Sequence, residues 1–133
     1  MMTNVHSLNP RTNLKAAQDL METDLINSYP IVSENKLVGI ITRTDILKVE
    51  PSKRTEKTVA DVMSGKILTV YPDEDLFSAL IRMISNGVGR LPVVRPDNHE
   101  SLIGIITRSD IAKAIEKHRS TQSLKRQETS TLV

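Results

Sequence analysis

The sequence of 133 residues contains one pattern twice. Displaced by 62 residues, the segment 10–32 matches 72–94 with 6 identities in 23 pairs. Displaced by 65 residues, the segment 37–48 matches 102–113 with 9 identities in 12 pairs. The second copy gains its three extra residues within 95–100, a stretch of turn-forming residues where an insertion costs little. One copy alone has too small a core for much stability, so the duplication predicts two small units that pack together.

Both copies predict the same order of elements: strand, helix, strand, turn, strand, helix. In the second copy, 67–70 is a short apolar strand, and apolar residues then recur at helical spacing from Leu76 to Ile84. The first copy has a weaker helix with the apolar residues Leu14, Ala17, Met21 and Leu25. We therefore expect an α+β fold of two pseudo-symmetric β-α-β-β-α units packed through their sheets. The expected boundaries are 1–50 for the first repeat, 51–58 for a linker, 59–119 for the second repeat and 120–133 for a polar tail.

Composition and charge argue against several classes of protein. Lys and Arg number 18 against 16 Asp and Glu, and this net charge of +2 gives no indication of a nucleic-acid partner. The chain has no cysteine, which excludes disulfides, thiolate zinc sites and cysteine nucleophiles and is compatible with a reducing cytoplasm. No apolar run approaches the length of a membrane span. His6, His99 and His118 lack metal-ligand spacing and no catalytic set is evident, so we expect neither a metal site nor an enzyme.

A threonine and an aspartate stand three residues apart where the third strand of each copy is expected to lead into a helix. These pairs are Thr42 with Asp45 and Thr107 with Asp110. A threonine hydroxyl at such a junction can bind a phosphate oxygen, and an aspartate in the first turn can accept hydrogen bonds from two ribose hydroxyls. Arg43 and Arg108 could supply charge to a phosphate. The same spacing is typical of a capping box, which needs no ligand, and both interpretations stay open because a cap can also face a cleft.

The pattern Pro-x-Val, a turn, then Leu-x-Gly-Ile-Ile-Thr-Arg-x-Asp-Ile occurs twice and resembles the CBS domain, of which a tandem pair is called a Bateman module. The resemblance covers roughly residues 3–117. It implies a cleft between the sheets of the two units, a disc-shaped homodimer and a regulatory rather than catalytic role. It also implies an adenosine-containing ligand in the cleft, such as AMP, ADP, ATP or S-adenosylmethionine, which signals to an attached or partner effector domain.

The resemblance assigns ligand contacts to particular residues. The threonine and aspartate of each junction would contact phosphate and ribose, and we favour the site of Thr107 and Asp110 because the second copy has the fuller lead-in over 64–67. Arg90, which stands where the first copy has Ser28, is a further candidate for phosphate. The adenine would lie against apolar residues of the first and the proline-containing strands: Val5, Tyr29 and Pro30 in one copy, and Ile67, Leu91 and Pro92 in the other.

The two ends of the duplication raise the question of a parent protein. The lead-in 58–63 has no counterpart before the first copy, so we expect a regulatory segment of a longer protein, with a stand-alone module as the alternative. The segment 89–110 looks similar to the CBS pairs of chloride channels, which would place the chain on the cytosolic side of a membrane. A structural dimerisation module with empty clefts is the competing function. A DNA-linked regulator is disfavoured, because the net charge is small and no helix-turn-helix pattern is present.

Overall fold

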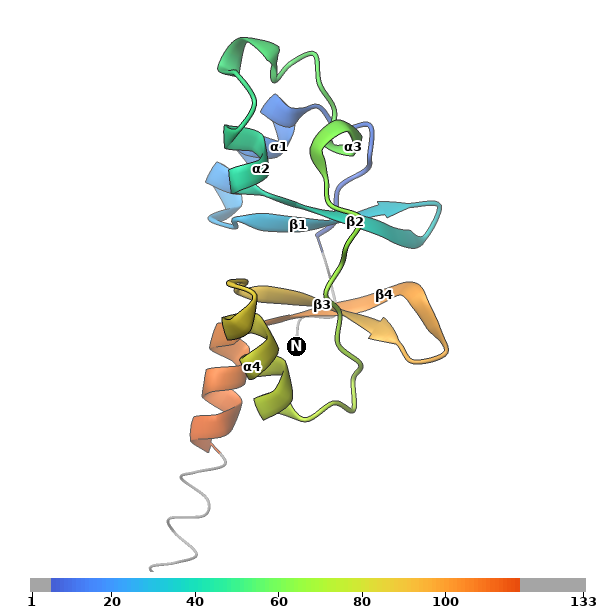
Figure 1. Cartoon of the computed structure of the whole chain (residues 1–133), viewed down its shortest axis with the longest axis vertical. Coiled ribbons are helices and arrows are strands. Elements are labelled where there is room, and N and C mark those ends of the chain that lie inside the picture. The colour runs from blue at the N-terminus through green and yellow to red at the C-terminus, as the bar shows by residue number, and fades with distance from the viewer. Residues whose placement is uncertain (1–5, 118–133) are drawn as a thin grey trace, which may run out of the picture.

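The computed structural model describes residues 6–117, so Val5, His118 and the tail over 120–133 lie outside the described part. Two small sheets face each other at the centre, and helices cover their outer faces (Figure 1). This arrangement confirms the predicted α+β architecture. The elements in chain order are α1 Leu14–Asp24, β1 Ser28–Ser33, β2 Lys36–Thr42, α2 Arg43–Leu47, the 3-10 helix Pro51–Lys53, α3 Val59–Val62, α4 Leu76–Ser85, β3 Arg90–Arg95, β4 Asn98–Thr107 and a helix over 108–117.

Each sheet is one antiparallel hairpin, and the two hairpins have matching registers. In the first, Pro30 of β1 lies opposite Ile40 of β2; in the second, Pro92 of β3 lies opposite Ile105 of β4. In both hairpins the register shifts directly after the strand residue that lies opposite a glycine. The β-bulge at this place is therefore duplicated along with the sequence. Strands β2 and β4 contact each other, and the two repeats therefore pack through their sheets.

The predicted strand over 67–70 is wrong in extent, because the structure contains only one bridge there, between Val70 and Val93. Val70 donates to the carbonyl of Pro92 at 3.0 Å and accepts from the N–H of Val94 at 2.9 Å. The next step of a parallel ladder would need the N–H of Pro92, and proline has none. The first repeat ends its ladder in the same way, since Leu8 bridges Ile31 directly after Pro30.

Each repeat has its own core, built largely as the apolar spacing predicts. Leu14, Ala17 and Met21 of α1 are buried in the first core, and Ala79 and Met83 of α4 are buried in the second. The apolar spacing does not predict burial correctly at the C-terminal ends of α1 and α4. Leu25 is 90% exposed because it caps α1 in a left-handed conformation with φ 56°, and Ile84 is 60% exposed on the outer side of α4.

The segment that leads into the second repeat packs on the first repeat. Val59 of α3 is buried in the first core, with Val62 and Met63 against it. Ser64 then joins the edge of β2 through two hydrogen bonds with Ile40, each 3.0 Å long. The expected linker is likewise attached to the first repeat, because the buried Arg54 donates to the carbonyl of Val49 at 2.9 Å and to Gln18 at 3.3 Å.

Candidate functional site

The threonine and aspartate pairs form capping boxes at the two strand-to-helix junctions. Asp45 Oδ2 accepts the N–H of Thr42 at 2.9 Å, and Thr42 Oγ1 accepts the N–H of Asp45 at 3.2 Å. In the second repeat, the same bonds join Thr107 and Asp110 at 3.1 and 3.0 Å. Partial burial acts to raise the pKa of Asp110, but the hydrogen bonds from Thr107, together with nearby positive charge such as that of Lys113, hold this pKa below its ordinary value. The capping role is therefore present in both copies, and one oxygen of each carboxylate takes part in it.

Further hydrogen bonds fasten each junction to the loop that precedes the first strand of its hairpin. The N–H of Arg43 donates to the carbonyl of Asn27 at 2.8 Å, and the N–H of Arg108 donates to the carbonyl of Gly89 at 2.9 Å. Helical geometry leaves the first N–H groups of a helix without acceptors inside the helix. After these bonds, the next N–H groups at the two junctions are those of Thr44 and Ser109, and both residues line the groove described next.

A groove of about 770 Å³ lies between the two repeats, and residues of both junctions line it. Its walls combine hydroxyl groups, an amide and apolar side chains with the glycine-rich loop over 87–89. The lining residues are Leu25, Ile26, Asn27, Ser28, Ile40, Thr42, Arg43, Thr44 and Leu47 from the first repeat, and Gly87, Val88, Gly89, Arg90, Thr107 and Ser109 from the second. The two junctions therefore face a single space, although they are 65 residues apart in the sequence.

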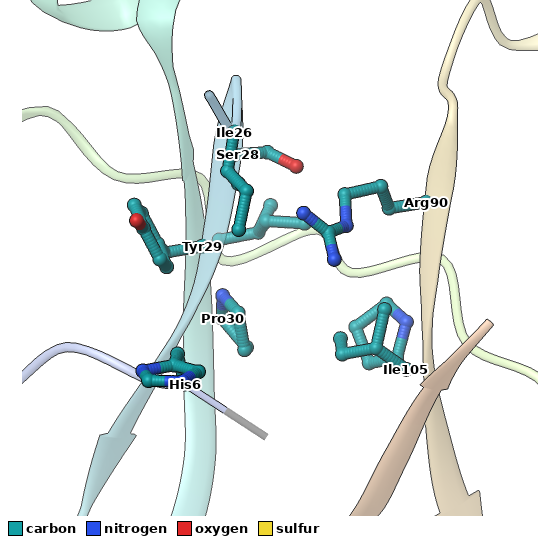
Figure 2. Close-up of a pocket in the computed structure, with 9 residues that line it drawn as sticks. His6, Ile26, Ser28, Tyr29, Pro30, Arg90 and Ile105 are labelled. Carbon is teal, nitrogen blue, oxygen red and sulfur yellow. The ribbon is translucent and has the colours of Figure 1, made fainter. Parts of the chain in front are cut away.

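A narrow pocket of about 20 Å³ lies deeper between the sheets, with room for about one water molecule. Pro30 and Ile40 line it from the first repeat, and Pro92 and Ile105 line it from the second. Figure 2 shows the Arg90 side chain reaching from β3 toward Ser28 and Tyr29 across the interface. The prolines thus form an apolar floor between the two sheets.

Several predicted contact residues lie elsewhere. The ring of Tyr29 borders the narrow pocket but is buried in the first core, and its hydroxyl donates to Asp24 Oδ2 at 2.6 Å. Burial raises the pKa of Tyr29, and the hydrogen bond to the Asp24 carboxylate adds to the effect. Leu91 is buried in the second core, and the half-buried Ile67 borders neither the groove nor the narrow pocket.

Arg43 and Arg108 have the same local sequence but different surroundings. Arg43 is exposed and lines the groove. Arg108 does not line it, because its guanidinium donates to the carbonyl of Val88 at 3.0 Å. Asp45 and Asp110 are also outside the lining, although Thr42 and Thr107 are part of it. The ligand contacts assigned to these four residues stay predictions.

Sequence reasoning missed other residues that line the two spaces. Ile40 and Ile105 face the opposite repeat, whereas the following Ile41 and Ile106 pack into their own cores. Strand alternation could have separated these neighbours, since successive side chains point to opposite faces. The contribution of the loop over 87–89 had no comparable signal, because loop residues show no period.

Comparison with known proteins shows to which family the chain belongs. The CBS domain family model matches residues 1–52 and 59–117. An uncharacterized protein of Methanocaldococcus jannaschii is 38% identical over 111 residues, which are 84% of this chain and 36% of that protein. The chain spans between about a fifth and about a third of the length of the first curated relatives it matches. Among the described residues, no helix is long and apolar enough to cross a membrane.

Two solved structures of similar fold contain adenosine-based ligands. CBSX2 from Arabidopsis thaliana, solved in complex with AMP, superposes with a TM-score of 0.76 and 29% identity, over 87% of this chain and 90% of that one. A CBS domain pair solved with 5′-methylthioadenosine and S-adenosyl-L-methionine gives a TM-score of 0.67 and 28% identity, over 88% and 94%. Because the family model matches two copies of the domain along most of the chain, the chain belongs to the CBS domain family and contains a CBS pair.

Proposed function

We propose that this CBS pair is a regulatory module whose inter-repeat groove binds an adenosine-containing ligand. One observation carries the proposal: both strand-to-helix junctions line a single groove of about 770 Å³. That volume lies within the range of about 300–1,000 Å³ that small-molecule sites occupy. The AMP and S-adenosylmethionine complexes of structurally similar CBS pairs support the ligand class.

The groove offers groups that suit each part of such a ligand. The hydroxyls of Thr42 and Thr107 accept hydrogen bonds within their caps, and each could turn its proton toward a phosphate oxygen, which for Thr107 would compete with its bond to the Asp110 carboxylate. The carboxylates of Asp45 and Asp110 each keep an oxygen outside the capping bond, which a ribose hydroxyl could reach after a small side-chain movement. Apolar residues such as Ile40 provide a surface for the base.

Binding would regulate by selecting one placement of the two repeats. The groove is lined from both sides, so a ligand in it contacts both repeats at once. A ligand shifts such an equilibrium only by its different affinity for the two placements. An attached domain or a partner protein would respond to the selected placement, and the resemblance to the CBS pairs of chloride channels stays a prediction about what that partner is.

The test is calorimetric titration of the chain with AMP, ADP, ATP and S-adenosylmethionine, alongside thermal melts. The informative variant is Ser109→Asp, because an acidic residue in the first turn of a helix favours the fold while its charge opposes a phosphate in the groove. The control is Ser52→Asp, an exposed serine outside the groove. We expect nucleotide binding that Ser109→Asp weakens and Ser52→Asp leaves unchanged. If none of the four ligands binds, the groove is not a sensor site, and the module without ligand becomes the better description.

A second proposal concerns self-association, which one surface of α4 favours. Phe77, Ile81 and Ile84 are 57%, 61% and 60% exposed and follow each other at helical spacing on its outer side. The corresponding positions of α1 are Lys15, Asp19 and Glu22. We propose that a second copy of the chain covers the apolar α4 surface, since the charged α1 counterpart shows that the fold itself does not need it.

Sedimentation velocity of the wild type and of Ile81→Ser tests this surface. We expect a dimer for the wild type and a monomer for Ile81→Ser, with the same melting temperature at high dilution. The matched control is Asp19→Ser on α1, which should stay dimeric. A wild type that is monomeric at all concentrations would contradict the proposal.

A further inference from the structure

The exposed apolar side chains of α4 form a regular row on the outer side of the second repeat (Figure 1). Phe77, Ile81 and Ile84 follow each other in steps of four and three residues, and each side chain is more than half exposed. Steps of four and three residues are the spacing of a coiled-coil seam, in which a row on one helix packs against a row on another helix. The spacing therefore predicts a helix as the counterpart of this row.

The α4 row can be covered without burying an unpaired charge. Arg82 belongs to the same helix, but its guanidinium donates to the Glu74 carboxylate at 2.7 Å and to the carbonyl of Thr69 at 2.6 Å. These bonds hold the charge on the segment that precedes α4. Ser78 and Ser85 are the exposed residues that directly follow Phe77 and Ile84, and both are small and neutral.

Among residues 6–117, no other helix carries a matching row. The other large apolar side chains that are exposed in this range are Leu20, Leu25, Leu47 and Leu68. They belong to four different places: the middle of α1, its C-terminal cap, the end of α2 and the lead-in of the second repeat. Because they do not repeat along one helix face, the matching row is the α4 row of a second copy.

The equivalent face of the first repeat is charged, which argues against a head-to-tail dimer. Lys15, Asp19 and Glu22 stand at the three corresponding positions of α1. Lys15 and Asp19 form an ion pair at 3.0 Å, with more than half of each side chain exposed. Packing α4 of one copy on α1 of the other would remove these charges from water, and the lost hydration can exceed what the ion pair returns. Packing α4 on α4 instead buries apolar surface on both sides.

We infer that the chain dimerises through its two α4 helices alone, so that the second repeats meet about a two-fold axis and the first repeats lie at the far ends. The inference rests on the proposed self-association and specifies which faces meet. It differs from the disc-shaped homodimer that the resemblance implies, because in a disc both repeats of each chain would face the partner. Two rows of three side chains bury less than the about 800 Å² per partner of a stable complex, so we expect a weak dimer that dissociates on dilution.

Cross-linking between introduced cysteines tests the inference, because the chain has no cysteine of its own. Ser78→Cys and Ser85→Cys each place a thiol beside the α4 row, and Asp19→Cys places one on the equivalent face of α1. The variants are treated with a short bis-maleimide, alone and in pairs, with one chain of each pair tagged so that mixed dimers are recognised by mass. We expect covalent dimers when both thiols are on α4, and none when either thiol is on α1.

Two matched variants show whether the cross-link depends on the row. Ile81→Ser in the Ser78→Cys chain removes the central side chain of the row and should abolish the cross-link. Glu22→Ser in the same chain changes α1 and should leave it unchanged. Sedimentation velocity under the same conditions shows whether the unmodified chain is a dimer.

The other outcomes separate this inference from the proposed self-association. A covalent dimer of Asp19→Cys with itself would show that the first repeats also meet, and one between Asp19→Cys and an α4 thiol would show a head-to-tail dimer. Either result, or a sedimenting dimer that no α4 pair cross-links, would overturn the inference and leave self-association standing. A wild type that sediments as a monomer at every concentration contradicts both.

Discussion

Replacing Gly39 with alanine should destabilise the first repeat by forcing the lead-in segment off β2. A Cβ at this position would lie 2.7 Å from Met63 Sδ and 3.0 Å from the carbonyl oxygen of Ser64. The thioether can rotate away, since it belongs to a flexible side chain. The Ser64 carbonyl cannot, because it is backbone and accepts the N–H of Ile40 at 3.0 Å. The new methyl group must therefore displace the bridge between Ser64 and Ile40.

The cost follows from three contributions. Overpacking a filled site costs about 1–3 kcal/mol. Weakening one or both hydrogen bonds of the bridge costs about 0.5–1.5 kcal/mol each. Alanine returns about 0.4–1 kcal/mol by restricting the unfolded chain, since the φ of Gly39 is not positive and alanine can adopt it. Together these contributions should lower the free energy of unfolding by about 2–3 kcal/mol at their mid-range values, which lowers the melting temperature by about 8–12 °C in a chain of this size.

Thermal and urea unfolding measure this effect against a matched control. The control is Gly65, which directly follows Ser64 in the lead-in segment. No heavy atom lies within 4 Å of a Cβ built at Gly65, so Gly65→Ala should be neutral or slightly stabilising. Adding Met63→Ala to Gly39→Ala should recover only part of the loss, because the Ser64 carbonyl stays in place. A Gly39→Ala protein that melts within 1 °C of the wild type, or a complete recovery by Met63→Ala, would refute the reasoning.

Two further predictions follow from hydrogen bonds to carboxylates. Asp110→Asn keeps an acceptor but loses the charge near the helix N-terminus, so it should cost about 0.3–1 kcal/mol at pH 7. Because the folded pKa of Asp110 lies below its ordinary value, the stabilisation is complete above that ordinary value and is lost as the pH falls through the folded pKa. Urea unfolding should show the two proteins converging as the pH falls below the ordinary aspartate pKa, and a constant difference would exclude the charge as the cause. Tyr29→Phe loses the bond to Asp24 and should cost about 1 kcal/mol near neutral pH. The pKa of Tyr29 is raised, so wild-type stability should decline above about pH 10, and an equally steep decline in Tyr29→Phe would argue against Tyr29 as the titrating group.

The duplication predicted the fold well, because the elements that it repeats depend on local signals. Proline at the start of one strand and glycine in its partner predicted both hairpins, and the apolar spacing predicted the buried faces of α1 and α4. The strand over 67–70 was overestimated, because its ladder depends on a donor from Pro92 in another segment. Local sequence likewise gave no indication that 59–64 would pack on the first repeat, since both sheets offer an edge of similar composition.

The candidate site was predicted as two separate junctions rather than as one groove. The capping boxes follow from spacing alone, and the structure contains both. The sequence could not predict which of Arg43 and Arg108 lines the groove. The two arginines stand in nearly identical local sequences, Thr-Arg-Thr-Asp and Thr-Arg-Ser-Asp. The difference arises in the preceding loops, where 87–89 is Gly-Val-Gly and presents the carbonyl of Val88, and 25–27 is Leu-Ile-Asn.

The lead-in segment also acts as a tether that limits how far the two halves can part. Ser64 is bound to the first sheet and Val70 to the second, and six peptide units join them. Even fully stretched, that span reaches only about 20 Å. The carbonyl of Thr69, held by Arg82 at 2.6 Å, leaves the usable length shorter still. Separation of the two sheets beyond that length would first have to strip Ser64 from β2.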